Sequence, residues 1–276
     1  MAFLVSRLQL NRRHKLYKTS NEVEADGTEK IMHNSIREII KKREEKAAIG
    51  DEESFDRCRL ISDSNDEKRT SVDECKTIYF AGHETTNTVL AWTVFLLAPH
   101  TDCQEEARKE VLQLFGRQNP NPGGIAKLKT VSTIINESLR LYPPIVSTER
   151  KVDREVRLGK LIVPANVEVV IPTIAIHHEP EVWGQDVQLF KADRFVQGVA
   201  KATNNNIAVF LPFATGPRNC AGMNFATTEV KIVLSMILQR NSSTLSPAYV
   251  HSPFQFLTLR PQHGVQVILH PLVNCP

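Results

Sequence analysis

One stretch of ten residues, Phe213–Gly222, constrains this chain more than any other part of it. It reads F-A-T-G-P-R-N-C-A-G, so Cys220 lies in a loop with glycines on both sides, and an apolar helix is expected over Met223–Gln239. A cysteine binds metal as the thiolate, and the positive N-terminal end of a helix favours a negative charge beside it. The stretch therefore predicts a loop that presents Cys220 as a thiolate ligand, the chemistry by which a haem iron can be held.

The residues around this cysteine suit a flat macrocycle. Gly216 and Gly222 allow the backbone to approach its plane closely, and Arg218 can donate a forked, charge-assisted pair to a propionate. Taken alone, such a cysteine is most often a buried residue in a loop before a core helix. The full pattern, F-x-x-G-x-R-x-C-x-G from Phe213, resembles the haem-binding loop of the cytochrome P450 family at every fixed position, with Ala214 in place of a glycine found in many members.

A second motif, A-G-H-E-T-T at Ala81–Thr86, lies in an apolar stretch that predicts a helix over Val72–Leu97. Ala81 and Thr85 are four residues apart and share one helix face. Taken alone, the motif fits a kink packed against another helix equally well. Its order before the cysteine loop resembles the family's oxygen-activation motif. The resemblance implies that Thr85 and Glu84 relay protons to bound dioxygen and that Ala81 leaves room beside the haem.

A third motif, E-S-L-R at Glu137–Arg140, falls in a helix expected over Thr130–Leu141. An acid–base pair three residues apart is common on exposed helices and usually contributes little. Apolar residues on both sides of this pair indicate burial instead. The motif resembles the E-x-x-R helix of the same family.

In that family the helical pair meets an arginine from a later segment. A-D-R-F at Ala192–Phe195 matches that segment, although its first two residues replace the usual proline and glutamate. The resemblance implies that Glu137, Arg140 and Arg194 form a buried structural network. That network would hold the loop that presents Cys220.

Weaker candidates follow from the resemblance as well. Arg150 aligns with an arginine that reaches a haem propionate. The segments Pro144–Ser147 and Ser252–Phe256 match loops that line the substrate cavity, although plain packing explains them equally well. Their candidate contacts are Ile145, Val146 and Phe254. The run His177–Glu179 predicts connecting structure rather than a metal site, because adjacent side chains point to opposite sides.

Composition excludes several classes of protein. The 276 residues are 41% hydrophobic and 24% charged, as in a globular chain with a sizeable core. A net charge of +3 is too small a bias to indicate a nucleic-acid partner. The five cysteines are odd in number and far apart, which indicates a reducing compartment without a disulfide framework or zinc site.

No membrane-spanning or signal segment is expected. The apolar start Met1–Val5 is far shorter than the ~20 residues that a span needs. The longer apolar run Thr77–Ala98 is interrupted by His83 and Glu84. A buried core helix is therefore the better interpretation of that run.

The remaining patterns predict a mainly α fold with small β-sheets. We expect a partial helical and linker region over residues 1–71 and a single haem-binding core over residues 72–276. The other expected elements are helices over Thr28–Lys46 and Asp102–Phe115, a linker over 50–74, a loop over Asn119–Gly124, strands over Leu161–Val163 and Val167–Ile171 turned at Pro164–Asn166, an irregular segment over 173–219, and a hairpin-like C-terminus over Phe254–His270.

The resemblance covers residues 72–270 and is strongest to the plant endoplasmic-reticulum branch of the family, within the clan that hydroxylates terpenoids, brassinosteroids and gibberellins. It implies haem b ligated by Cys220, an NADPH-dependent flavoprotein reductase as electron donor, and a hydrophobic small-molecule substrate. It also implies that the protein lies at the cytosolic face of the endoplasmic-reticulum membrane. The implied reaction inserts one atom of dioxygen into the substrate.

The chain resembles only the C-terminal half of such enzymes, so an N-terminally truncated fold is expected. The helices that roof the substrate cavity precede the central helix in full-length members. Without them, we expect exposed apolar surface over Val89–Leu97. A haem-binding fragment without turnover is therefore the alternative to a monooxygenase.

Overall fold

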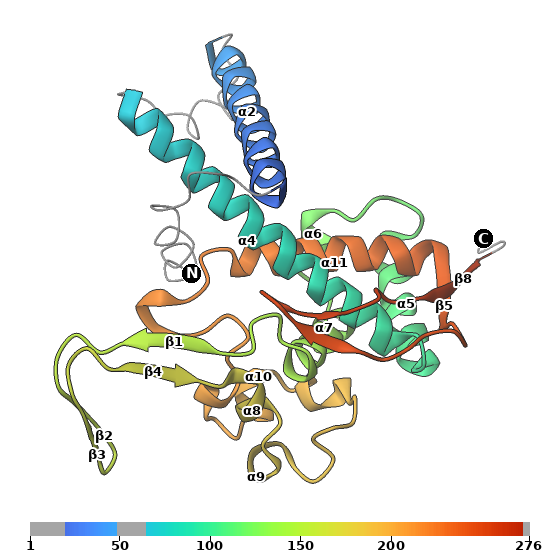
Figure 1. Cartoon of the computed structure of the whole chain (residues 1–276). Helices are drawn as coiled ribbons and strands as arrows, with labels where there is room; N and C mark the ends of the chain where they lie inside the picture. Colours follow the sequence, from blue (N-terminus) through green and yellow to red (C-terminus); the bar gives the residue numbers. More distant parts are fainter. Residues whose placement is uncertain (1–19, 49–64, 273–276) are drawn as a thin grey trace. The chain divides into compact units, whose positions relative to one another are not determined.

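The computed structural model describes residues 20–48 and 65–272 (Figure 1). The chain divides into two compact units, residues 1–81 and 82–276. The division falls within the long helix α4 (Asn65–Leu97). The expectation of one haem-binding core over residues 72–276 stays a prediction.

The described part of the first unit is helical. α2 (Ser20–Ala48) is longer than the helix expected over Thr28–Lys46, and exposed ion pairs such as Lys42–Glu38 line its surface. The Lys76 ammonium lies 2.6 Å from the Glu29 carboxylate and joins α2 to the start of α4. The expected linker over 50–74 is wrong for residues 65–74, which are helical, while residues 50–64 lie outside the described part. Charged residues there are good helix formers, and polarity alone does not separate a solvated helix from a loop.

The exposed apolar surface of α4 lies upstream of where it was expected. Val89, Trp92 and Leu97 are buried, so the predicted exposure of Val89–Leu97 is wrong. Trp92 stacks on Tyr142 and is covered by elements that follow α4 in the chain. Exposed apolar residues of α4 lie about three turns before Val89, at Ile78, Tyr79 and Phe80.

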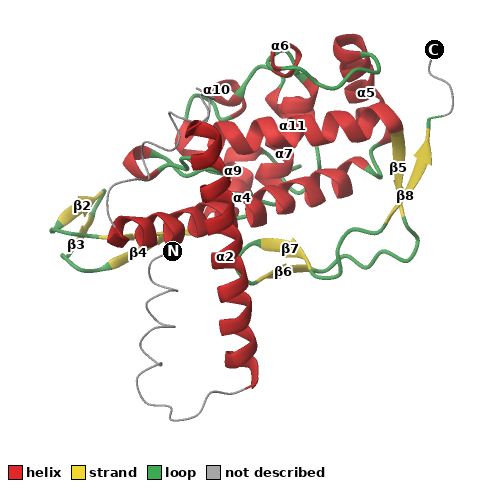
Figure 2. Ribbon diagram, turned by 90° about the horizontal axis from the view of Figure 1, so that it is seen from above, coloured by secondary structure: helices red, strands yellow, loops and turns green. Residues whose placement is uncertain are grey.

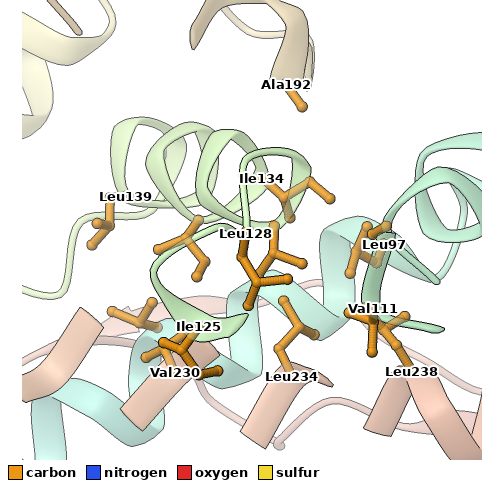
Figure 3. Packing of buried hydrophobic residues seen from close by; sticks show 14 of the residues in the cluster. Leu97, Val111, Ile125, Leu128, Ile134, Leu139, Ala192, Val230, Leu234 and Leu238 are labelled. Carbon is orange, nitrogen blue, oxygen red and sulfur yellow. The ribbon is translucent and has the colours of Figure 1, made fainter. Parts of the chain in front are cut away.

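The core of the second unit is built by helices on both sides of α7 (Thr130–Leu141), a helix whose bounds match the sequence prediction. Figure 3 shows side chains of α11 directed toward the segment that leads into α7 and toward α7 itself. The packed residues include Leu97, Val111, Leu128, Ile134, Val230, Leu234 and Leu238. They come from α4, α5 (Thr101–Phe115), the segment after α6 (Pro122–Ile125), α7 and α11 (Met223–Arg240).

The N-terminus of α7 is capped from another helix. The Glu110 carboxylate of α5 accepts hydrogen bonds from the backbone amides of Lys129, Thr130 and Val131 at 2.7, 2.9 and 3.0 Å. These are among the amides that lack partners at the start of any helix, and a negative charge there is favoured. Glu110 therefore fixes the helix that carries the E-S-L-R motif.

The described strands form four two-stranded antiparallel sheets, which with the helices confirm a mainly α fold with small sheets (Figure 2). The pairs are β1 (Thr148–Lys151) with β4 (Glu168–Ile171), β2 (Val156–Leu158) with β3 (Leu161–Val163), β5 (Asn241–Leu245) with β8 (Val267–Pro271), and β6 (Pro253–Gln255) with β7 (Leu259–Pro261). The expected C-terminal hairpin holds only for β6–β7, because β8 pairs with the strand that follows α11. The strands expected at 161–163 and 167–171 pair with the earlier strands β2 and β1.

The segment expected to be irregular, 173–219, contains one-turn helices that are too short for a periodic signal. They are α8 (Thr173–His177), α9 (Pro180–Trp183), η2 (Ala192–Phe195), α10 (Val199–Ala202), η3 (Ile207–Val209) and η4 (Gly216–Arg218). A further short helix, α6, replaces part of the expected loop 119–124. Within the ranges that the structure describes, no helix combines the length and apolarity needed to cross a membrane.

Candidate haem-thiolate site

The backbone of the cysteine loop is fixed by its own hydrogen bonds. The Cys220 amide donates to the Phe213 carbonyl at 2.9 Å, and the Asn219 amide donates to the Gly216 carbonyl at 3.1 Å. Two residues turn the chain through the left-handed region, Gly216 with φ +80° and Ala214 with φ +58°. The replacement of the family's glycine by Ala214 therefore places a side chain where L-residues are strained.

Most of the cysteine loop is exposed to solvent. Every residue from 215 to 225 is exposed, including Cys220, whereas Cys75 and Cys103 are partly buried. The exposed residues include Met223 and Phe225, apolar side chains of the first turn of α11. A Cβ at Gly222 would lie 3.9 Å from the Cys220 sulfur, so a side chain there would extend beside the thiol.

This donor set fits a haem. A soft thiolate, glycines beside it and exposed apolar side chains suit the face of an iron macrocycle. Phe213 anchors the loop from the inside, since it packs against the hydrophobic core. Arg218 is exposed in η4, two residues before Cys220. Arg150 lies on β1, where its Nη1 donates to the Glu149 carbonyl at 2.9 Å.

Glu137, Arg140 and Arg194 lie in one network. The Arg140 Nε and Nη2 donate to the two Glu137 carboxylate oxygens at 2.8 and 2.7 Å, and both side chains are fully buried. The Arg194 Nε lies 3.4 Å from Glu137 Oε1, which also accepts from the Lys191 amide at 3.1 Å. A fully buried carboxylate thus has two cations and a backbone donor around it.

The same network holds the backbone between α8 and η2. Arg140 Nη1 donates to the carbonyls of His177 and Val187 at 3.0 and 2.8 Å. Arg194 donates to the Trp183 carbonyl at 2.7 Å and to the Asp186 carboxylate at 2.6 Å. Hydrogen bonds from Lys191 and Arg194 hold the pKa of the Asp186 carboxyl low, at about 2.

The Glu84 carboxylate points to the C-terminal hairpin. Its Oε1 accepts from the Thr258 hydroxyl at 3.0 Å and lies 3.5 Å from Arg260 Nη1. The hydroxyls of Thr88 and Thr258 lie 3.2 Å apart and are buried beside it. Thr85 Oγ1 is 3.5 Å from the Gly82 carbonyl oxygen. A cavity of about 390 Å³ opens between Glu84 and Arg260. Thr258 and Arg260 were not candidates from the sequence, because a single threonine and arginine in an alternating strand give no signal.

The first segment proposed to line a substrate cavity, Pro144–Ser147, contacts the hairpin that contains most of the second. The Leu259 amide donates to the Pro144 carbonyl at 2.9 Å, so the residues after α7 lie against the β6–β7 hairpin. Trp92 of α4 contacts the same hairpin, since its Nε1 donates to the Leu259 carbonyl at 2.6 Å. Ile145 and Val146 are partly buried, and Phe254 is 42% exposed. Their contact with a substrate stays a prediction.

The second unit thus combines an exposed cysteine in a glycine-flanked loop with a buried acid–arginine network, Glu137–Arg140–Arg194. The sequence model of the cytochrome P450 family matches residues 4–268, nearly the whole chain. The chain therefore belongs to the cytochrome P450 family.

The relatives are plant proteins. The chain is 54% identical over 267 residues to cytochrome P450 CYP749A22 of Panax ginseng, covering 93% of this chain and 51% of the relative. It is 44% identical over 258 residues to 11-oxo-beta-amyrin 30-oxidase of Glycyrrhiza uralensis, covering 88% and 49%. It is 47% identical over 201 residues to 7-deoxyloganic acid hydroxylase of Catharanthus roseus, covering 73% and 38%. The chain spans about half the length of the first two relatives.

Proposed function

We propose that this chain forms the haem-binding part of a monooxygenase that inserts one oxygen atom of O₂ into a hydrophobic plant metabolite. The observation that carries the proposal is the exposed Cys220 thiol in a loop whose backbone is tied to Phe213. Two relatives are named as an oxidase of 11-oxo-beta-amyrin and a hydroxylase of 7-deoxyloganic acid. A terpenoid or steroid-like substrate is therefore the class to test first.

The proposed roles divide between holding the haem and moving protons. Cys220 binds the iron through its thiolate. Phe213, Gly216, Arg218, Gly222, Ala81 and Arg150 form its protein surroundings. Haem b, when bound, supplies the activation of dioxygen. Glu84 and Thr85 would hold and transfer protons during the reaction, and the contacts of Glu84 with Thr258 and Arg260 orient its carboxylate.

The proposed partners follow from the family. Electrons come from NADPH through a separate flavoprotein reductase. The proposed location is the cytosolic face of the endoplasmic-reticulum membrane.

The Glu137–Arg140–Arg194 network serves the site indirectly, since it fixes the backbone that precedes the cysteine loop.

An alternative concerns a protein that consists of these 276 residues alone. Ile78, Tyr79 and Phe80 of α4 expose apolar side chains. Oxygen activation needs a site that excludes water. Such a protein would bind haem without efficient turnover.

A reduced, carbon-monoxide-bound spectrum of the purified chain reconstituted with haem tests the proposal. We expect the red-shifted Soret band of a thiolate ligand. Its absence in wild-type chain that retains its fold would overturn the haem-thiolate assignment. NADPH consumption with reductase and a panel of plant terpenoids then separates the two functions. Product tightly coupled to NADPH use supports the monooxygenase, whereas a thiolate band without coupled product supports the haem-binding fragment.

A further inference from the structure

His177 lies between the acid–arginine network and the segment that runs to the cysteine loop. It is fully buried at the end of α8. Its Nε2 accepts a hydrogen bond from the Leu211 amide at 2.9 Å, and its ring stacks on Phe210 with the centroids 5.3 Å apart. Its own carbonyl accepts from Arg140 Nη1 at 3.0 Å. One residue therefore contacts α7 through its backbone and the pre-cysteine segment through its ring.

The hydrogen bond to Leu211 determines the protonation state of the His177 ring. A nitrogen that accepts a hydrogen bond carries no proton, so the proton of the neutral ring is on Nδ1. Among the described residues, Nδ1 has no hydrogen-bond partner. A proton on Nε2 would face the Leu211 N–H and remove the contact.

The surroundings of the His177 ring favour its neutral form. Burial, the largest cause, and electrostatic repulsion from Arg140 and His178 lower the pKa of the His177 imidazole to about 4, although the backbones of Arg140 and Leu139 act in the other direction. Glu137, the nearest acid on α7, is already paired with Arg140. The aromatic rings of Phe210 and Trp183 also lie beside the imidazole.

We propose that His177 is a positioning residue for the cysteine loop, and that its neutral ring holds the segment 210–213 against the acid–arginine network. Two residues beyond Leu211, the Phe213 carbonyl accepts the amide of Cys220. A displacement of Leu211 therefore reaches the backbone that orients the thiol. The effect on the thiolate rests on the proposed function, whereas the hold on Leu211 does not.

The neighbouring histidine provides a matched control. His178 is partly buried, and its Nε2 contacts the Leu141 carbonyl at 3.0 Å rather than the pre-cysteine segment. A change at His178 disturbs the same short helix without touching Leu211. Only a change at His177 removes the acceptor of the Leu211 amide.

Three variants of the chain with haem separate the role of the acceptor from that of the ring. His177→Gln keeps an acceptor near the position of Nε2, His177→Phe keeps an aromatic ring without one, and His178→Gln is the control. Hydrogen exchange of the Leu211 amide is measured at pH 7 with the thiolate Soret band. We expect His177→Phe to lose at least tenfold in protection at Leu211 and to weaken the thiolate band. His177→Gln and His178→Gln should keep both.

Retained protection of Leu211 in His177→Phe would overturn the proposal, as would the loss of protection in His177→Gln to the level of His177→Phe. If His177→Phe does not fold, the wild-type chain decides: a protected Leu211 amide together with an Nε2 lacking a proton in nitrogen NMR supports the proposal, and an amide that exchanges freely overturns it. A thiolate band absent from wild type while Leu211 is protected would refute the haem-thiolate function but leave the hold on Leu211 standing.

Discussion

Arg140 and Glu137 face each other across one turn of α7 through two hydrogen bonds, of 2.8 and 2.7 Å, with no solvent contact for either side chain. Arg140 also donates to backbone carbonyls of His177 and Val187. Removing one partner of a fully buried ion pair destabilises the fold, because the other partner is left as an uncompensated buried charge. This pair therefore joins α7 to the backbone at residues 177 and 187, and its contribution to stability is open to a direct test.

The first prediction concerns this pair. Glu137→Ala should lower the free energy of unfolding by about 3–5 kcal/mol, since it leaves Arg140 buried without its carboxylate. That is a large share of the ~5–15 kcal/mol of a typical domain. Thermal melting and haem content measure the loss. Glu38→Ala removes an exposed pair with Lys42 and should change neither. Wild-type melting and haem content in Glu137→Ala would show that the network does not stabilise the fold.

The second prediction assigns the iron ligand. Cys220→Ser should abolish the thiolate Soret band of the carbon-monoxide complex, while Cys75→Ser and Cys103→Ser should keep it. Burial raises the pKa of the Cys103 thiol to about 11, so that sulfur stays protonated near neutral pH. Cys58 lies outside the described residues, and its serine variant should also keep the band. A thiolate band that survives in Cys220→Ser would end the assignment.

The third prediction concerns the backbone of the cysteine loop. Gly216→Ala should destabilise the chain by about 1–2 kcal/mol, because its φ is +80° and L-residues are strained there. Apart from the chain neighbours of Gly216, no atom of the described residues lies within 4 Å of the added Cβ, so the expected loss comes from backbone strain. Ala214→Gly should act in the opposite direction by less than ~1 kcal/mol, since the greater entropy of unfolded glycine offsets part of the gain. Urea unfolding compares the variants, and equal stability of Gly216→Ala and wild type would contradict the prediction.

The fourth prediction is a pH dependence. The pKa of His177 is lowered from 6.5 to about 4 in the folded chain, chiefly by burial. Well above pH 6.5 the ring is neutral in both the folded and the unfolded chain, so His177 does not lower the free energy of unfolding there. As the pH falls below 6.5 the unfolded chain binds the proton first, so stability is lost progressively toward pH 4. Between pH 7.5 and 5.5 this loss is about 1.4 kcal/mol.

The variant His177→Gln isolates the contribution of His177 to this pH dependence, because glutamine does not titrate. The free energy of unfolding of this variant should fall by about 1.4 kcal/mol less than that of wild type between the two pH values. Urea unfolding at equal haem content measures both. An identical fall in the two proteins would mean that His177 is not buried in its neutral form.

Much of the helical part of the fold could be predicted from the sequence. The bounds of α7 agree with the prediction, and those of α5 and α11 differ from it by one residue. Each has an apolar stripe that only a helix buries along its length. The start of α4 was missed because its first turns are charged, and the pairing of β5 with β8 was missed because their contact joins segments more than twenty residues apart.

The candidate site divides in the same way. The sequence was enough to propose Cys220 and Arg218 as haem contacts, which stays a prediction, and to predict the burial of the E-S-L-R pair, which is confirmed. Ligand chemistry and motif spacing are local properties of the chain. The tertiary structure decided that Glu84 points to Thr258 and that His177 accepts from Leu211. These contacts join residues 174 and 34 positions apart. Only packing brings such groups together and removes the water that would otherwise satisfy them, so no local pattern records their pairing.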